Sequence, residues 1–338
     1  MKRDRLRVMM STPSIRPTTN PYISQLVASL EPHVEVVFFS WRRAIFGRYD
    51  VLHVHWPETF TSSPAVIKMW ARRFCTMVLQ LRLSSRPTAL VRTAHNVAPH
   101  EARESSTDAA ILRRWDRLTT LWIVLNGRTE PPSAAPRTLI PHGHYRDHFA
   151  GSPRSQADAS RVSVVGHVRP YKGIEELISE IASGSDSAVN LHIAGRPSSR
   201  ALADRLVSLA EGSEQIALEL DFVDDPRLAQ IITSSSLVLL PYREMHNSGV
   251  ALLALSLGRP VLVPDNEVTR DLAQEVGEGW VHRISPDGVL PSIRRALEAG
   301  IPSGEPDLSA RDWPVSAARH AAAYAKAVEL RRGQRRST

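Results

Sequence analysis

The stretch Ser163-Val-Val-Gly-His-Val-Arg-Pro-Tyr-Lys-Gly173 decides how the rest of the sequence is interpreted. A short apolar segment runs into Gly166, and a loop with Arg169 and Lys172 follows. After Gly173 the apolar residues recur at helical spacing. A strand, a basic loop and a helix amino terminus in this order can bind an anion, because N–H groups, the helix dipole and two cations converge. The loop alone fits an ordinary βα turn with two solvated basic residues equally well.

A second stretch of the same kind lies further along the chain. Residues 237–242, Leu-Val-Leu-Leu-Pro-Tyr, have the pattern of a buried strand, and a helical run begins after Ser248-Gly249. Gly258-Arg-Pro260 ends that run, and the apolar segment 261–264 predicts another strand. The free N–H groups at the start of this helix can hold a second anion. Two such turns in one domain favour a diphosphate ligand.

Strands alternate with helices along the chain, which predicts an α/β fold with doubly wound parallel sheets. A chain of 338 residues is long enough for two such domains with separate cores. We expect a first domain over 1–149 and a second over 161–311, with a helical tail over 312–338. The segment 150–160, rich in Gly, Ser and Pro and without periodicity, is the expected linker.

Composition limits the classes of function. Hydrophobic residues make up 42% and charged residues 23%, as in an ordinary soluble protein. The single cysteine, Cys75, excludes an internal disulfide and favours a reducing compartment. The sequence has neither a secretory leader nor an apolar run of about 18 residues, so we expect a cytoplasmic protein. The net charge of +7 favours an anionic partner, but no nucleic-acid-binding signature accompanies it.

A basic amphipathic segment extends over residues 64–87 and contains no acidic residue. A helix of this kind can lie on an anionic membrane surface. The alternative is a core helix with a solvated basic face. On the first interpretation, the expected acceptor or membrane contacts are Lys68, Trp70, Arg72 and Arg73.

These motifs resemble the second half of GT-B glycosyltransferases. More narrowly, they are similar to bacterial exopolysaccharide enzymes of the GDP-mannose:glycolipid 4-β-mannosyltransferase type. Segments 53–58, 95–101 and 140–145 extend the resemblance over nearly the whole chain. It implies two Rossmann-like domains facing across a cleft, with the C-terminal helix crossing back to the first domain. It also implies transfer of a hexose, mannose from GDP-mannose, to a lipid-linked glycan at the inner face of the plasma membrane, without a cofactor.

The expected donor-binding residues come from the two anion-binding turns and their surroundings. The resemblance adds the turn after residue 141, which it puts near the donor and the interdomain cleft. A simple hinge is the alternative interpretation of that turn. The donor-binding set comprises Gly166, His167, Arg169, Lys172, Gly173, Tyr242, Ser248, Gly249, Val250, His142 and Gly143.

An inverting transfer needs a base that removes a proton from the acceptor hydroxyl, and a carboxylate or a histidine can do this. Residues 88–95 predict a strand whose carboxyl end delivers His95 and the residues up to Glu101, where ligands bind in open α/β sheets. Glu101 and Glu58 are the candidate carboxylates, and His95 is the alternative. A helix cap or a histidine bonded to backbone would explain the same residues structurally.

One departure from the family pattern concerns the mechanism. Retaining relatives carry two glutamates eight positions apart, and these positions fall on His246 and Ala254 here. Their absence favours an inverting transferase and leaves Glu267 as the candidate ribose contact. The segment Asp224-Asp225-Pro226 predicts a helix start rather than a metal-binding motif, so we expect no metal. A retaining transferase that lost the glutamates, or a catalytically silent binder of nucleotide-sugar or glycan, is the alternative.

Overall fold

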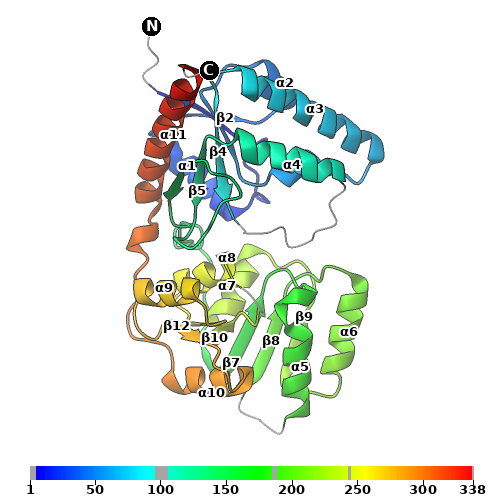
Figure 1. The fold of residues 1–338 in the computed structure, drawn as a ribbon. Coiled ribbons are helices and arrows are strands. Elements are labelled where there is room, and N and C mark those ends of the chain that lie inside the picture. The colour runs from blue at the N-terminus through cyan, green and yellow to red at the C-terminus, as the bar shows by residue number, and fades with distance from the viewer. Residues whose placement is uncertain (1–4, 96–105, 185–188, 243–244, 337–338) are drawn as a thin grey trace. The chain divides into compact units, whose positions relative to one another are not determined.

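The computed structural model describes residues 5–95, 106–184, 189–242 and 245–336. The chain divides into two compact units. Unit 1 consists of Met1–Gly143 and Arg311–Thr338, and unit 2 of His144–Ala310. Each unit is built from one parallel sheet with helices on both of its faces (Figure 1). The predicted α/β class with doubly wound parallel sheets is therefore confirmed.

Unit 1 contains a six-stranded sheet in the order β2-β1-β3-β4-β5-β6, and every described pair of strands is parallel. Its strands are β1 (Arg7–Met10), β2 (Glu35–Phe38), β3 (Val51–Val54), β4 (Ala89–Ala94), β5 (Leu121–Val124) and β6 (Arg137–Leu139). Its helices are α1 (Pro21–Leu30), α2 (Trp41–Phe46), α3 (Val66–Ser85), α4 (Ser106–Leu118) and α11 (Trp313–Arg336).

Strand alternation explains how this sheet buries both of its faces. Val51 and Leu52 are neighbours in β3, yet Val51 packs with α1 and α11 while Leu52 packs with α2, α3 and α4. Successive residues of a strand point to opposite faces, so a strand covered on both sides must be apolar throughout. α1 begins at a side-chain cap: the Tyr22 N–H donates to the Asn20 side chain at 2.9 Å, and Pro21 is the first residue of the helix.

Unit 2 contains the second sheet, in the order β12-β11-β10-β7-β8-β9. Its strands are β7 (Asp158–Val165), β8 (Asn190–Ala194), β9 (Ile216–Glu219), β10 (Ser235–Leu239), β11 (Val261–Val263) and β12 (Val281–Arg283). Its helices are α5 (Ile174–Ser183), α6 (Arg200–Ala210), α7 (Asp225–Thr233), α8 (Gly249–Ser256), α9 (Glu267–Val276) and α10 (Val289–Ala299).

The strand order of unit 2 indicates where a ligand would bind. The chain proceeds from β7 outward through β8 and β9, and then returns to β10 on the other side of β7. Ligands of open α/β sheets bind beyond the carboxyl ends of the strands at such a reversal. The loops after β7 and β10 are the two anion-binding turns of the sequence.

The segment expected to be a linker contributes to unit 2. β7 already begins at Asp158, and the Ser155 N–H donates to Thr233 Oγ1 at 2.9 Å, which attaches this segment to the end of α7. Just before the segment, Tyr145 and Phe149 are buried in the core beside α8, and the Tyr145 N–H donates to Ser256 Oγ at 2.9 Å. Aperiodic composition conceals these anchors, because they depend on single side chains rather than on a repeated pattern.

Candidate functional site

The two turns that the sequence predicts to bind anions lie against each other within unit 2. A Cβ atom added to Gly173 would be 2.6 Å from the backbone oxygen of Pro241. A Cβ atom added to Gly166 would be 3.4 Å from Cγ2 of Val250. The loop after β7 therefore contacts the loop after β10 at two points, and the structure brings together turns that are about 75 residues apart in the sequence.

Glycine is required in these loops by backbone conformation as well as by space. Gly166 and Gly173 have φ angles of 94° and 69°, in the region that side chains rarely allow. Gly195, after β8, has a φ of 144°, and its added Cβ would lie 2.1 Å from the backbone oxygen of Gly166. The backbone at the carboxyl ends of β7 and β8 is therefore packed too closely for any side chain.

Lys172 is the cation that this arrangement buries. It is only 7% exposed, and its Nζ lies 4.8 Å from the centroid of the Tyr242 ring. Within the described part of the chain, no carboxylate pairs with it. Burial, with the charge of Arg169, lowers its pKa to about 8, so the ammonium is still mostly charged at pH 7. A buried cation without a counter-charge is costly, and an anionic ligand would remove that cost.

The helix amino termini beside Lys172 offer backbone donors. No side chain of the described residues caps α5, whose N-cap residue is Gly173. α8 is capped by Ser248, whose Oγ accepts from the Ala251 N–H at 3.2 Å. His167, predicted to contact the donor, is exposed next to Gly166. These positions suit a diphosphate, because helix N–H groups and the helix dipole favour negative charge.

The start of α9 is linked to the same region. The Asn266 side-chain amide donates to the Met245 backbone oxygen at 2.8 Å, and Glu267 is exposed in the first turn of α9. Ala254, where retaining relatives carry a glutamate, is fully buried in α8. Glu267 therefore lies near the turn after β10, whereas the position of Ala254 faces the core.

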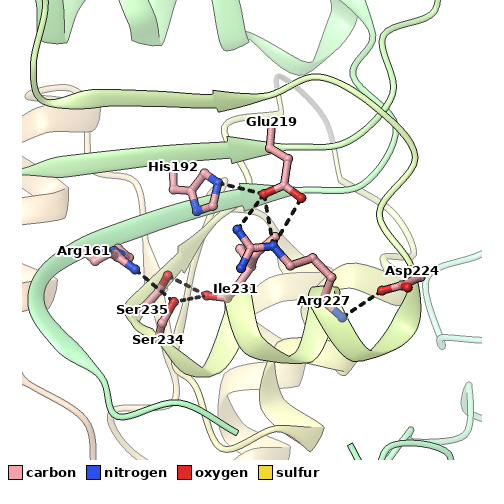
Figure 2. Close-up of polar contacts among 8 residues, drawn as sticks. All are labelled: Arg161, His192, Glu219, Asp224, Arg227, Ile231, Ser234 and Ser235. Atoms are coloured by element: carbon pink, nitrogen blue, oxygen red, sulfur yellow. Dashed lines mark hydrogen bonds and ion pairs between the residues drawn. The ribbon is translucent and has the colours of Figure 1, made fainter. Parts of the chain in front are cut away.

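The acidic residues after β9 have structural partners (Figure 2). Asp224 caps α7 by accepting from the Arg227 N–H at 2.9 Å, which confirms the predicted helix start. Glu219 pairs with Arg227 at 2.8 Å and with His192 at 3.5 Å. Asp225 pairs with His148 at 2.7 Å. Among the residues that the structure describes, no group of three or more His, Cys, Asp or Glu side chains is arranged to hold a metal.

A cluster of histidines occupies the carboxyl end of the unit 1 sheet. Nδ1 of His55 lies 3.0 Å from Nε2 of His95. His53 contacts the hydroxyl groups of Tyr324 and Thr93, each at 2.8 Å. Alternation in β3 and the pairing of β3 with β4 bring these side chains together. Of these histidines, only His95 and His142 were expected in a site from the sequence, although the His-Val-His spacing could have indicated that His53 and His55 share a face.

Burial keeps these histidines neutral. Desolvation lowers the pKa of His95 to about 3, and it lowers the pKa of His142 and His320 to about 4. The pKa values of His53 and His55 also lie well below the ordinary range, because of burial first and neighbouring histidines second. At pH 7 the cluster therefore carries neutral imidazoles, which can donate or accept hydrogen bonds.

Of the other residues predicted from the first half of the sequence, the structure describes Glu58, His142 and Gly143. Glu58 is exposed in a short 3₁₀ turn, Pro57–Phe60, that follows β3. Glu101 lies outside the described residues. His142 is part of the histidine cluster, where its ring lies 4.4 Å from that of Tyr22. Gly143 faces the Trp313 indole, which an added Cβ would approach to 2.5 Å, so packing explains this glycine.

A pocket of 340 Å³ opens beside the histidine cluster, entirely within unit 1. It is formed by the loop between β1 and α1 together with the residues that follow β3. Its lining combines hydroxyl groups, one guanidinium, an indole and an imidazole. The polar and aromatic lining residues are Ser11, Thr12, Ser14, Arg16, Thr19, Asn20, His55, Trp56 and Thr59.

The basic segment predicted from residues 64–87 forms α3, and one of its expected contacts needs correction. Lys68, Trp70 and Arg72 are exposed. Arg73 is instead 6% exposed, and its guanidinium forms two contacts with the Asp108 carboxylate of α4, at 2.5 and 3.0 Å. Its charge holds α3 to α4, so Arg73 does not belong to a membrane-facing surface.

Comparison with known proteins identifies the family of the chain. Residues 159–298 match the family Glycosyl transferases group 1. Over 333 residues the chain is 40% identical to the GDP-mannose:glycolipid 4-beta-D-mannosyltransferase of Xanthomonas campestris pv. campestris, covering 96% of this chain and 93% of that protein. A protein of the same name from another strain of that bacterium is 39% identical over the same length.

Two solved structures share the fold at low identity. Sucrose-phosphate synthase from Thermosynechococcus elongatus matches with a TM-score of 0.59 and 16% identity over 97% of both chains. Anabaena HepE, solved with UDP and glucose, matches with a TM-score of 0.58 and 13% identity over 98% of this chain and 99% of its own. The fold is thus that of GT-B glycosyltransferases, and the resemblance inferred from the sequence is confirmed: the chain is a glycosyltransferase that belongs to the family of GDP-mannose:glycolipid 4-β-D-mannosyltransferases.

Proposed function

We propose that the protein transfers mannose from GDP-mannose to a lipid-linked glycan, with inversion at the anomeric carbon and without a metal. The name of the 40% identical Xanthomonas relative supports the donor, the acceptor class and the β-linkage. The observation that carries the proposal is Lys172, a buried cation to which the described residues offer no carboxylate and to which a nucleotide diphosphate would bring a counter-charge.

The proposed donor site comprises both glycine turns of unit 2. Arg169 and Lys172 would neutralise the diphosphate, and the first amides of α5 and α8 would hydrogen-bond its oxygens. Their charge would stabilise the leaving GDP as the glycosidic C–O bond breaks, which is the role a metal plays in other transferases. Glu267 would accept hydrogen bonds from the ribose, near the turn after β10.

The acceptor would bind to unit 1, where the carboxyl end of the sheet carries the candidate bases. Glu58, Glu101 and His95 remain the proposed set. Inversion requires that the acceptor oxygen attack the face of the sugar opposite the diphosphate while the base removes its proton. The absence of the glutamate pair of retaining relatives supports inversion, because His246 and Ala254 stand in its two positions.

Transfer of radiolabelled mannose tests this proposal directly. GDP-[¹⁴C]mannose and a glycolipid extract of Xanthomonas campestris should yield labelled lipid, and EDTA should leave the rate unchanged. Lys172→Ala should lower kcat/KM by roughly 10²- to 10³-fold, the usual effect of removing one stabilising charge. Arg200→Ala, which removes an exposed cation of the same unit, is the control and should retain activity.

Three results would count against parts of the proposal. Loss of activity in EDTA with recovery in Mg²⁺ would exclude a metal-independent reaction. An α-linked product, identified by NMR of its anomeric proton, would exclude inversion. Absence of both transfer and slow GDP-mannose hydrolysis would favour a silent binder of nucleotide-sugar or glycan.

We also propose that α3 attaches the protein to the inner face of the plasma membrane, as a peripheral enzyme of exopolysaccharide assembly. α3 carries large apolar side chains on an exposed face as well as on its buried one. At about 100° per residue, the exposed ones fall within about a third of the circumference. They are Val66, Ile67, Trp70, Phe74, Met77 and Leu81, with exposed fractions between 42% and 86%.

Charge and chemistry favour a lipid surface as the occupant of this stripe. α3 contains no acidic residue, so the helix carries no negative side chain that an anionic leaflet would repel. Phe46, at the end of α2, is 81% exposed and adds to the apolar surface. In the described part of the chain, no helix is both long and apolar enough to cross a bilayer.

Sedimentation with phosphatidylglycerol vesicles tests membrane attachment. Wild-type protein should pellet with the vesicles, and the double variant Trp70→Ser, Phe74→Ser should stay in the supernatant with its transition temperature unchanged. Phe222→Ser, which removes a 74% exposed phenyl group from unit 2, is the matched control. Equal pelleting of the double variant and wild type would exclude α3 as the membrane contact.

A further inference from the structure

The pocket of unit 1 has the lining expected for a sugar. Hydroxyl groups of Ser11, Thr12 and Thr59 line it together with the Trp56 indole. Such a combination suits a polyhydroxylated ring, because the hydroxyl groups exchange hydrogen bonds while the indole packs on apolar C–H groups. Its volume of 340 Å³ lies at the small end of the range of about 300–1,000 Å³ for small-ligand sites.

His55 is the lining residue with an unused polar atom. Its side chain is 3% exposed, and Nε2 has no hydrogen-bond partner among the described residues. Its Nδ1 is occupied by Nε2 of His95 at 3.0 Å. A buried polar atom without a partner costs free energy, so its presence beside a pocket points to a ligand that completes the hydrogen bond.

The contact with His95 determines which nitrogen of His55 can accept a proton. One of the two rings must donate across the 3.0 Å contact. If His55 donates from Nδ1, its Nε2 is a bare acceptor. If His95 donates, the Nε2 of His55 carries a buried N–H without an acceptor. Orphaned buried N–H groups are rarer in proteins than unsatisfied acceptors, so the first arrangement is favoured. His95 thereby fixes the tautomer of His55.

We propose, resting on the transferase function above, that this pocket holds the reacting sugar of the acceptor and that His55 Nε2 is the catalytic base. In the step, the acceptor O–H bond breaks as its proton moves to Nε2. The hydroxyl oxygen forms a bond to the anomeric carbon of the donor sugar. The bond from that carbon to the diphosphate breaks, and GDP leaves with the electron pair.

The surroundings of His55 suit this role. Its pKa lies well below the ordinary value, chiefly through burial, so the imidazole is unprotonated and ready to accept at neutral pH. Tyr22 meets His55 edge-on at 5.7 Å, and Trp56 stacks on His95 at 4.5 Å, so ring packing holds both imidazoles in place.

Two of the other candidate bases, His95 and Glu58, are less well placed with respect to this pocket. His95 directs Nε2 at His55, which makes it a positioning residue in this scheme. Glu58 is exposed on the turn after β3, and the described lining of the pocket passes from Trp56 to Thr59 without it. Of these three side chains, only His55 combines a place in the lining with an unused nitrogen.

A pair of variants separates proton transfer from structure. His55→Asn keeps an amide where Nδ1 meets His95, and His55→Gln keeps one near Nε2, but neither can accept the proton. Both should lower kcat for mannose transfer to the Xanthomonas glycolipid extract by about 10²- to 10⁴-fold. Hydrolysis of GDP-mannose by water should persist, because the proposed donor site lies in unit 2.

The matched control is His320→Asn. His320 is equally buried, and its Nε2 also has no partner among the described residues, but it does not line the pocket. Its substitution should leave kcat unchanged. Imidazole ¹⁵N NMR of wild-type protein should show an unprotonated Nε2 on His55. His95→Ala should populate both His55 tautomers in the NMR spectrum. It should also lower kcat when measured at a temperature where the variant is still folded.

The outcomes distinguish this inference from the function on which it rests. Wild-type protein without transferase activity would overturn the proposed function. Active wild-type protein together with His55→Asn and His55→Gln at full kcat would overturn only the assignment of His55. A protonated Nε2 in the NMR spectrum would also overturn it, because a protonated nitrogen cannot act as the base.

Discussion

Mild acid should unfold unit 1, because its buried histidines cannot take up protons while they stay folded. His95 has a pKa of about 3, and His142 and His320 have pKa values of about 4. In the unfolded chain each returns to about 6.5. The folded values are the lower ones, so the unfolded state binds more protons, and stability is lost as the pH falls below about 6.5.

The size of the loss follows from these shifts. At pH 5 an unfolded histidine is almost fully protonated, whereas a folded one with a pKa of 3 or 4 carries at most about a tenth of a proton. Relative to pH 7.5, each of the three then costs about 2 kcal/mol of unfolding free energy, or about 6 kcal/mol together. His53 and His55, whose pKa values are also lowered, add to this loss. A domain is stable by only about 5–15 kcal/mol in total.

Urea unfolding followed by tryptophan fluorescence measures the loss of stability of unit 1. Of the seven tryptophans, only Trp280 belongs to unit 2, so the signal reports mainly on unit 1. The free energy of unfolding should fall from pH 7.5 to 6.5 and then to 5, with a larger loss per pH unit in the second interval than in the first. His320→Phe removes one titrating ring. Between pH 7.5 and 5 its free energy of unfolding should therefore fall by about 2 kcal/mol less than that of wild type.

An exposed histidine provides the control. His167→Gln removes an exposed histidine of unit 2 and should leave the fall unchanged. If unit 1 loses less than about 1 kcal/mol between pH 7.5 and 5, the cluster is not held neutral by burial. An unfolding free energy that falls equally in wild type and His320→Phe would refute the role of His320.

Three further predictions concern packing and capping. Gly195→Ala should lower the transition temperature and weaken GDP binding in calorimetry, because the new Cβ would lie 2.1 Å from the Gly166 backbone oxygen. An unchanged affinity for GDP would contradict this prediction. Arg73→Met should destabilise unit 1 by roughly 1–3 kcal/mol in urea, since Asp108 loses its guanidinium partner, and Arg73→Met with Asp108→Leu should recover most of that loss. Ser248→Ala should cost about 1 kcal/mol by removing the α8 cap, and Ser248→Gly only a few tenths; an equal cost for both would argue against capping.

Local patterns were sufficient to predict the fold class and the two glycine-containing turns that follow β7 and β10. Alternating strands and helices specify a parallel α/β unit, and a glycine at the end of an apolar strand marks a turn wherever it occurs. The helix start at Asp224 followed from residues within a few positions. These features depend on backbone conformation and hydrogen bonds over a short span of sequence.

The histidine cluster and the partners of the charged side chains were decided by tertiary structure. His53, His95, His142 and His320 are far apart in the sequence, and only the strand order and the packing of α11 bring them together. Arg73 looked like a surface cation until Asp108 was found beside it.

The sequence by itself thus determined what each short segment becomes, because propensity, capping and turn geometry act between near neighbours. Tertiary structure decided which side chains are removed from water. Burial gives Lys172 and His55 their unusual chemistry, and it arises from contacts between segments that no local pattern connects.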